Sequence, residues 1–236
     1  MKTKLDEILF IDIETVPANP DFAGLNEDFQ KFWDKKSAFF RGENETAEDV
    51  YQRAGIYAEF GKIVCISVGL LFQKDGIKKF RLKSFAGHDE KQLLNEFADM
   101  LNGYSPTGDK VFCGHNIKEF DMPYISRRMI INGIKLPEII NLHGKKPWEV
   151  NHIDTLELWK FGDYKNYTSL DLLANLFNIP TPKDDIDGSQ VAQVYYEENN
   201  LERIVKYCEK DVLTVARLYL KMKLLPGIDD ENVEYA

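Results

Sequence analysis

The sequence of 236 residues has few cysteines, no long apolar run and no excess of positive charge. Its three cysteines, Cys65, Cys113 and Cys208, lie far apart without a C-x-x-C pair, which excludes a disulfide framework and a cysteine zinc site. No apolar stretch approaches the ~20 residues of a membrane-spanning helix. The segment MKTKLDE lacks the apolar centre of a signal peptide. We therefore expect a cytoplasmic protein with no membrane partner.

The charge balance is acidic, with a formal net charge of −9. This charge disfavours a protein that holds nucleic acid through bulk electrostatic attraction. It remains compatible with an acidic site that is filled by metal cations, because bound cations then provide the positive charge that contacts an anion. The hydrophobic content of 44% is sufficient for one well-formed core. We expect residues 1–236 to form a single domain.

The pattern of apolar residues predicts alternating strands and helices. Strands are expected at residues 7–13, 61–72, 77–85, 110–116 and briefly at 152–154. Helices are expected at residues 88–104, 119–133, 168–179 and 188–224, the last with a break at Asn199-Asn200. Residues 18–60 form an insertion with helical patterning at 25–40 and 46–60, and the acidic last ten residues are expected to be frayed. This order predicts an α/β fold with a mixed central sheet and flanking helices.

The first chemical motif is Asp12-x-Glu14 within the strand-like run ILFIDIETVP. Residues i and i+2 of a strand point to the same face, so the two carboxylates are expected side by side. Two like charges beside a core are costly unless a partner neutralises them. A divalent cation that prefers oxygen ligands would do so. The alternative is a strand end that frays into water, and a single D-x-E motif does not decide between the two.

Two further motifs follow along the chain. Asp121 comes after a short strand and a turn, in GHNIKEFD, and Tyr207 and Asp211 lie four residues apart on a helical segment. Spacing of i, i+4 places Tyr207 and Asp211 on one helix face. Each motif has an ordinary explanation when it is taken alone. A carboxylate is favourable near a helix N-terminus, and a tyrosine beside an acid is common on a protein surface.

Taken together, the motifs D-x-E, N-x-x-x-F-D and Y-x-x-x-D resemble the DEDD superfamily of 3′-5′ exonucleases. The tyrosine of the third motif resembles that of one branch of the superfamily, whereas Lys206 stands where the other branch has histidine. The chain is most similar to the proofreading exonuclease domain of family B DNA polymerases, as a free-standing bacterial relative. The resemblance spans about residues 8–220 and implies a ribonuclease H-like fold.

This resemblance implies hydrolysis of phosphodiester bonds with two divalent cations, Mg²⁺ or Mn²⁺. Asp12, Glu14 and Asp211 would hold the cation that activates the attacking water. Asp12 would bridge to a second cation, supported by Asp121, that stabilises the leaving 3′-oxygen. Four carboxylates suit magnesium or manganese better than zinc.

The resemblance also suggests roles beyond the carboxylates. Tyr207 would orient the attacking water, because a phenol that titrates near pH 10 is a poor general base. Thr15 would help to hold the terminal 3′-hydroxyl, and Asn116 and Phe120 would line the path of the phosphate and the base. Asn116 could instead cap a turn, and Phe120 could instead be core packing.

The expected activity is release of nucleoside monophosphates from the 3′ end of single-stranded DNA. An exoribonuclease of the same superfamily is an alternative, because the carboxylates do not distinguish the two sugars. A non-catalytic nucleic-acid-binding module is another alternative. The motifs occupy nearly the whole chain, so proofreading would act in trans with a polymerase or repair protein as partner. The 18–60 insertion could clamp the substrate, dock a partner or simply cover the fold.

Overall fold

The protein is described by a computed structural model that covers residues 4–163, 165, 167–180 and 186–236. Within this part, six strands form one mixed sheet in the order β5-β4-β1-β2-β3-β6. The strands are β1 (Ile8–Pro17), β2 (Gly61–Lys74), β3 (Ile77–Ala86), β4 (Val111–Gly114), β5 (Ile153–Asp154) and β6 (Val233–Tyr235). β1 pairs antiparallel with β2 and parallel with β4, so it lies in the interior of the sheet.

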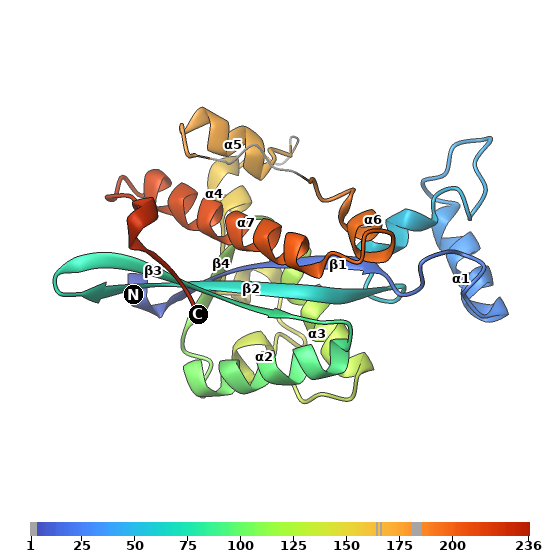
Figure 1. Cartoon of the computed structure of the whole chain (residues 1–236), viewed down its shortest axis with the longest axis horizontal. Helices are drawn as coiled ribbons and strands as arrows, with labels where there is room; N and C mark the ends of the chain where they lie inside the picture. Colours follow the sequence, from blue (N-terminus) through green and yellow to red (C-terminus); the bar gives the residue numbers. More distant parts are fainter. Residues whose placement is uncertain (1–3, 164, 166, 181–185) are drawn as a thin grey trace.

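Helices cover both faces of this sheet (Figure 1). The α-helices are α1 (Glu27–Ser37), α2 (Glu90–Tyr104), α3 (Asp121–Ile131), α4 (Thr155–Lys160), α5 (Leu170–Leu176), α6 (Val191–Tyr196) and α7 (Leu201–Met222). Short 3-10 helices are η1 (Leu5–Glu7), η2 (Tyr51–Ile56), η3 (Glu138–Ile140), η4 (Pro147–Glu149) and η5 (Asp230–Asn232). α7 lies along one face, with α4, α5 and α6 on the same side, whereas α2 and α3 cover the other face. The predicted mixed sheet with flanking helices is therefore confirmed.

The alternation of side chains along β1 divides the core into two layers. Leu9, Ile11 and Ile13 pack with α2 and α3, whereas Ile8 and Phe10 pack with the apolar residues of α7. These β1 side chains are almost completely buried. Because successive side chains of a strand point to opposite faces, Asp12 and Glu14 continue the α7 side of β1.

A bulge interrupts the pairing of β1 with β2 beside these acids. Glu14 is paired with Cys65 and Thr15 with Ile63, so Val64 is the extra residue on β2. Val64 and Cys65 consequently both join the apolar cluster beneath α6 and α7, while Ile63 joins the opposite layer. Bulges often re-aim side chains next to functional sites.

The strands predicted at 61–72 and 77–85 are confirmed as β2 and β3, which form a hairpin and pair antiparallel from Cys65↔Ala86 to Lys74↔Ile77. The two-residue turn of this hairpin consists of Asp75 and Gly76, both with positive φ. Two positive φ values in succession match the twist of a hairpin, and Asp-Gly is a favoured sequence for such a turn.

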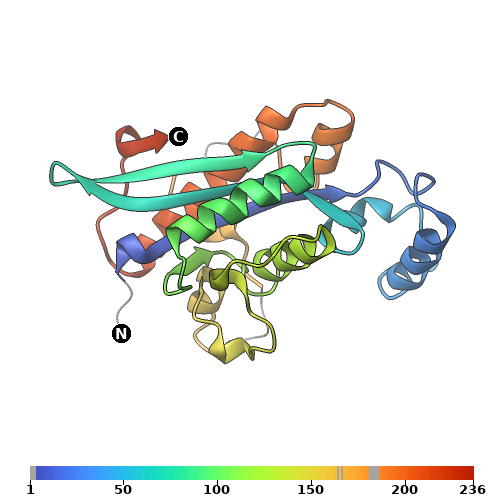
Figure 2. The same ribbon diagram turned by 90° about the horizontal axis from the view of Figure 1, so that it is seen from below.

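The insertion at residues 18–60 forms a lobe with its own small core, beyond the end of β1 (Figure 1 and Figure 2). Trp33 of α1 is fully buried at its centre and donates its indole N–H to the carbonyl of Ala47 at 2.8 Å. The helix predicted at 25–40 is confirmed by α1. The helical patterning at 46–60 yields only the 3-10 helix η2, and Gly55 within it lies close to β1, where an added Cβ would come within 3.2 Å of Val16 and Pro17.

The prediction that the last ten residues are frayed is wrong. Residues 233–235 form β6, which pairs parallel with β3 at the edge of the sheet. Glu234 forms ion pairs with Lys79 and Arg81, and the carbonyl of Ile228 accepts hydrogen bonds from the buried Arg217 guanidinium. These long-range contacts hold a segment whose local composition indicates disorder. Among the helices of the described residues, none combines the length and apolar character of a membrane span.

Candidate active site

The site is built first on β1, which carries Asp12 and Glu14 toward α7. Glu14 is 7% exposed and Asp12 is half-buried, so neither lies on a strand end that frays into water. The thiol of Cys208 on α7 donates hydrogen bonds to the main-chain oxygen and to Oδ2 of Asp12, both at 3.4 Å. The strand therefore places two acids against a helix in the interior.

Asp121, the first residue of α3, reaches this place from the loop that follows β4. A side chain on Gly114, the last residue of β4, would lie 2.9 Å from the carbonyl oxygen of Ile11 and would overlap Ile117. Asn116 has a φ of +63°, a left-handed conformation that asparagine tolerates better than most residues. This tight turn places Asp121 beside β1, where only 4% of it is exposed.

The buried Asp154 holds that turn. Its Oδ1 accepts hydrogen bonds from the backbone N–H groups of Asn116 and Leu156, both at 2.9 Å, and its Oδ2 accepts one from Lys118 at 3.2 Å. Asp154 is also the N-cap of α4, through its hydrogen bond from Leu156 N. The bonds to the β4–α3 loop, which order the segment before Asp121, were not predicted.

The third component is α7, whose first half carries Tyr207 and Asp211. The helix begins at an Asn200 cap that accepts a hydrogen bond from Arg203 N, so the predicted break before it is confirmed. Its buried stripe includes Ile204, Cys208, Val212 and Val215. Tyr207 and Asp211 lie at the border of this stripe and are half-buried, as the spacing predicts.

The electrostatics of the site show that the acids influence one another. Burial raises the pKa of Asp12 well above its ordinary value, and the charges of Asp211 and Asp121 raise it further. The pKa of Glu14 is raised by burial and then by the charges of Asp12 and Asp211. Burial and the charges of Asp211, Glu14 and Asp12 also raise the pKa of Tyr207. The structure therefore brings the five predicted side chains together in one place.

The pKa of Asp121 is raised mainly by its burial. Burial raises this pKa to about 7 and the charge of Asp154 adds to the rise, although the backbone N–H groups of Asp121 and Ile13 favour the charged form and oppose it. A buried charge is costly in a folded protein unless a cation compensates it.

Cys208 is a component of the site that its sequence motif does not indicate. One ligand atom from each of Asp12, Glu14 and Cys208 lies within 4.8 Å of the others. The available signal was its position one residue after Tyr207 and three before Asp211, which places it near the same helix face.

The donor set agrees with the predicted cations. Carboxylate oxygens are the ligands that Mg²⁺ and Mn²⁺ prefer, whereas a site selective for zinc would contain more thiolate or imidazole. The acids whose pKa values are raised here, Asp12, Glu14 and Asp121, are those that a bound cation would keep ionised. The residues present therefore fit divalent cations of this class.

The predicted substrate-binding residues lie around this cluster. Thr15 follows Glu14 on β1, and its hydroxyl interacts with Tyr124 of α3. Asn116 forms the turn already described, and its carbonyl accepts hydrogen bonds from the N–H groups of Glu119 and Phe120. The Phe120 ring packs against the ring of Tyr124, with the centroids 5.4 Å apart. Asn116 thus has the turn-forming function and Phe120 the packing function that the sequence left open, and these do not exclude substrate contacts.

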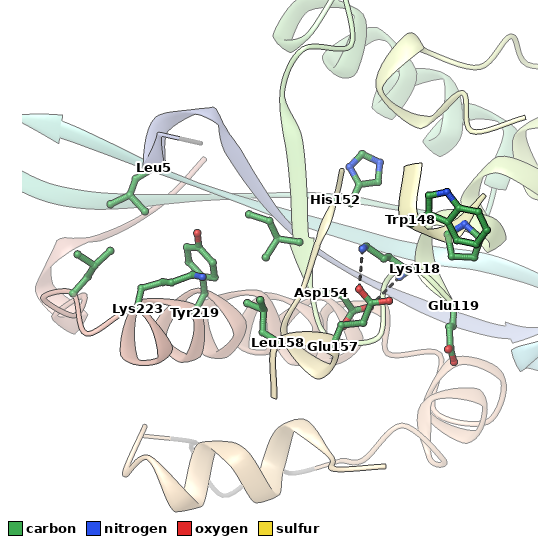
Figure 3. A pocket seen from close by; sticks show the side chains of 13 residues that line it. Leu5, Lys118, Glu119, Trp148, His152, Asp154, Glu157, Leu158, Tyr219 and Lys223 are labelled. Atoms are coloured by element: carbon green, nitrogen blue, oxygen red, sulfur yellow. Dashed lines mark hydrogen bonds and ion pairs between the residues drawn. The ribbon is translucent and has the colours of Figure 1, made fainter. Parts of the chain in front are cut away.

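A groove of about 1100 Å³ follows the β5 edge of the sheet (Figure 3). The Lys118–Glu157 ion pair lies toward one end, and Tyr219 and Lys223 of the last part of α7 and its end lie toward the other. In the described part of the chain, its lining includes Asp154 but none of the five clustered side chains. The groove therefore lies beside the loop that leads to Asp121, away from the cluster itself.

A family model described as a predicted 3′-5′ exonuclease related to the exonuclease domain of PolB matches residues 56–235. The chain belongs to this family. The match includes Asp121, Tyr207 and Asp211, whereas β1 with Asp12 and Glu14, and most of the insertion, lie outside it. The family predicted from the three motifs is thereby confirmed.

Two known proteins to which the chain is similar are DNA polymerases. The chain is 25% identical over 181 residues to DNA polymerase 120R of Invertebrate iridescent virus 3, which covers 61% of the chain and 15% of the viral protein. The structure of the family B DNA polymerase from the hyperthermophilic archaeon Pyrobaculum calidifontis is similar, with a TM-score of 0.52 and 18% identity. That similarity covers 90% of this chain and 24% of the archaeal chain, and it confirms the predicted ribonuclease H-like fold. The chain thus spans a quarter or less of each polymerase.

Proposed function

We propose that the protein is a metal-dependent 3′-5′ exonuclease that hydrolyses single-stranded DNA and releases nucleoside monophosphates. The observation that carries the proposal is that Asp211 and Asp121 act electrostatically on Asp12, and that Asp211, Glu14 and Asp12 act on Tyr207, in a chain of an exonuclease family. The proposal treats residues 1–236 as one exonuclease domain with an insertion at 18–60.

The carboxylates divide into two overlapping sets of cation ligands in this proposal. Asp12, Glu14 and Asp211 would hold one divalent cation, and Asp12 and Asp121 would hold the second. When bound, Mg²⁺ or Mn²⁺ ions supply charge neutralisation at the phosphate and acidify the attacking water. The protein's part is to keep four acids at one point of the fold, which β1, α3 and α7 do through their buried packing.

Tyr207 contributes a hydrogen bond and no proton transfer. Its pKa is raised by burial and by three neighbouring carboxylates, so the phenol stays protonated at neutral pH. A protonated hydroxyl donates a hydrogen bond and can orient the oxygen of the attacking water. This agrees with an orienting function and opposes a function as general base.

The substrate end is placed by the backbone and side chains that surround the cluster. We assign the terminal 3′-hydroxyl to the chain at Glu14 and Thr15. The phosphate and base path runs along Asn116 and Phe120, at the loop that Asp154 holds. The names of both relatives are those of DNA polymerases, which favours DNA over RNA as the substrate. The polymerase context also supports proofreading in trans, with a polymerase or repair protein as partner.

A cleavage assay tests the proposal. Purified protein is incubated with a 5′-labelled single-stranded DNA 20-mer and with the matched RNA, in Mg²⁺, Mn²⁺ or EDTA. Asp12→Ala removes a cluster ligand, and Asp99→Ala on the exposed face of α2 is the matched control. We expect shortening from the 3′ end in Mg²⁺ or Mn²⁺ that EDTA and Asp12→Ala abolish and Asp99→Ala preserves.

The other outcomes assign the alternatives. Faster degradation of the RNA than of the DNA would identify an exoribonuclease. Binding of the strand without degradation in either metal would identify a non-catalytic nucleic-acid-binding module and refute the proposed activity.

A further inference from the structure

The outer surface of the insertion exposes aromatic rings. Phe32 of α1 is 59% exposed and Phe39, just after α1, is 87% exposed. Phe29, one turn before Phe32, is 40% exposed and packs edge-to-face on Phe32 and on Phe60, with ring centroids about 6 Å away in each case. The lobe has its own buried centre around Trp33, so these outer rings are not needed to fill it.

A surface hollow of about 370 Å³ lies among these rings. Its lining consists of Phe32, Lys35, Lys36, Phe39, Glu59 and Phe60. Lys35 and Lys36 are exposed, and in the described part of the chain neither has a carboxylate partner within ion-pair distance. The Nζ of Lys36 lies 4.6 Å from the centre of the Tyr57 ring. The hollow thus combines flat apolar walls with the two positive charges of Lys35 and Lys36 and the one negative charge of Glu59.

The lobe is anchored next to the catalytic cluster. The hydroxyl of Tyr124 on α3 donates to the carbonyl of Gly55 at 2.7 Å, and Arg128 donates to the carbonyl of Ala58 at 2.9 Å. α3 is the helix that begins with Asp121. β1, which carries Asp12, runs directly into the insertion. A strand whose 3′ end lies at Asp12 therefore has the insertion as one of the elements beside its path.

We propose that this aromatic–lysine face, residues 29–39 with Phe60, binds unpaired nucleotides upstream of the 3′ end by base stacking and phosphate contact. The inference rests on the proposed exonuclease function and adds a substrate-binding surface to it. Residues 29–39 lie outside the matched range of the family, whereas Phe60 lies inside it.

Single-stranded nucleic acid suits this face better than a protein does. Aromatic side chains stack on any base and lysines neutralise phosphates, which is the usual combination at single-strand sites. Lysine is instead depleted at the centre of protein–protein interfaces. In a chain with a net charge of −9, a local pair of lysines beside exposed rings also marks a place where phosphate is tolerated.

The first test measures binding without cleavage. Fluorescence anisotropy in EDTA gives the Kd of the full chain for labelled dT20 and rU20. The Phe32→Ala/Phe39→Ala double variant removes two exposed rings, and Tyr235→Ala removes one that is 68% exposed on β6. Loss of one stacked base costs a factor of about five or more. We expect the Kd of the double variant to rise at least about fivefold and that of the control to stay unchanged. The dT20 and rU20 arms show whether the surface distinguishes the sugars.

The second test isolates the lysines. For single strands, the slope of log K against log salt decreases by about 0.7 for each phosphate contact that is lost. The Lys35→Ala/Lys36→Ala double variant, which removes two such contacts, should therefore show a slope that is shallower by about 1.4. Lys91→Ala on the exposed face of α2 should leave the slope as in the wild type.

The cleavage assay separates this inference from the proposed function. The aromatic double variant should lose kcat/KM on a 20-mer more than on a trimer, through KM, because only the longer strand reaches the surface. A wild type that cuts both substrates and a double variant with unchanged Kd and unchanged kcat/KM would overturn the inference alone. A wild type that cuts neither substrate would refute the proposed exonuclease activity. The comparison of Kd values would still show whether the aromatic–lysine face binds single strands. An unchanged Kd together with a dimer that only the aromatic variant loses would overturn it in favour of contact between copies.

Discussion

Asp121→Asn tests whether the carboxylate cluster is electrostatically strained in the absence of cations. Burial raises the pKa of Asp121 to about 7, from an ordinary value of 3.8. Because the pKa of Asp121 is higher in the folded than in the unfolded state, its protonated side chain does not destabilise the fold below about pH 4. The folded state then loses stability as the pH rises through 7. At pH 8 the ionised side chain therefore costs about 4 kcal/mol.

Asparagine has nearly the same shape and can accept a hydrogen bond, but it carries no charge. In EDTA at pH 8 the variant should be more stable than the wild type by up to about 4 kcal/mol. In a chain of this size that corresponds to a Tm higher by roughly 8–16 °C. At pH 5 the difference in unfolding free energy should fall to about 1.6 kcal/mol, and it should vanish below about pH 4, where the unfolded carboxyl is also protonated.

Denaturant unfolding in EDTA at pH 5, 6.5 and 8 measures this difference, with Asp99→Asn on α2 as the control for loss of an exposed acid. With Mn²⁺ at pH 8 the wild type should become more stable than Asp121→Asn. A ligand that binds only the folded state stabilises it, and the variant has one carboxylate fewer to bind the cation. A variant that is less stable than the wild type at pH 8 in EDTA, or a difference independent of pH, would refute the reasoning.

Three further substitutions test other parts of the site. Tyr207→Phe should lower kcat by about 10- to 100-fold yet leave more activity than Asp12→Ala, because it removes only the orienting hydrogen bond; equal losses would assign Tyr207 a larger function. Asp154→Asn should lower the free energy of unfolding by about 1–3 kcal/mol and lower kcat, because one acceptor of the loop N–H groups is lost. Denaturant unfolding and steady-state kinetics measure the two effects. An unchanged kcat would show that the loop does not affect catalysis. Gly114→Ala should lower the free energy of unfolding by about 1–3 kcal/mol, because the new methyl group overlaps Ile117. A variant as stable as the wild type would show that the β4–α3 turn adjusts to the methyl group.

The part of the site that was predictable depends on short periodicities. The i, i+2 spacing of Asp12 and Glu14 and the i, i+4 spacing of Tyr207 and Asp211 are fixed by strand and helix geometry. Both survive small errors in the element boundaries, such as the extension of β1 to Pro17. The order of the motifs along the chain then identified the family.

The contacts that were not predicted link residues far apart in the sequence. Asp154 binds the loop at Asn116 and Lys118, a relation that its local N-cap pattern does not contain. Glu90 likewise reads as a surface helix residue, but it is 8% exposed and accepts hydrogen bonds from Arg128, Asn132 and Ile63 N. Such residues become visible only after the sheet has brought their partners together.

The C-terminal segment shows the opposite error, in which composition suggested disorder. β6 is only three residues long, and its pairing with β3 spans about 150 residues of sequence. No local periodicity can indicate a strand that short. The ion pairs of Glu234 with Lys79 and Arg81 convert an acidic tail into an edge strand.

The connection between β1 and β2 has a consequence for engineering a smaller nuclease. Pro17 pairs with Gly61 and Ala18 N donates to Phe60 O at 2.8 Å, so topologically the two strands are a hairpin whose loop is the whole insertion. Excising residues 19–53 would leave the four carboxylates on unbroken elements and would shorten the loop, with a gain of roughly 1.5 kcal/mol in closure entropy. Residues 54–60 must stay, because Tyr124 and Arg128 of α3 donate hydrogen bonds to carbonyl groups in this segment. The excision would expose Phe60, which packs in the core of the lobe. The ladder that ends at Pro17 and Gly61 thus makes the lobe a detachable module of an otherwise continuous scaffold.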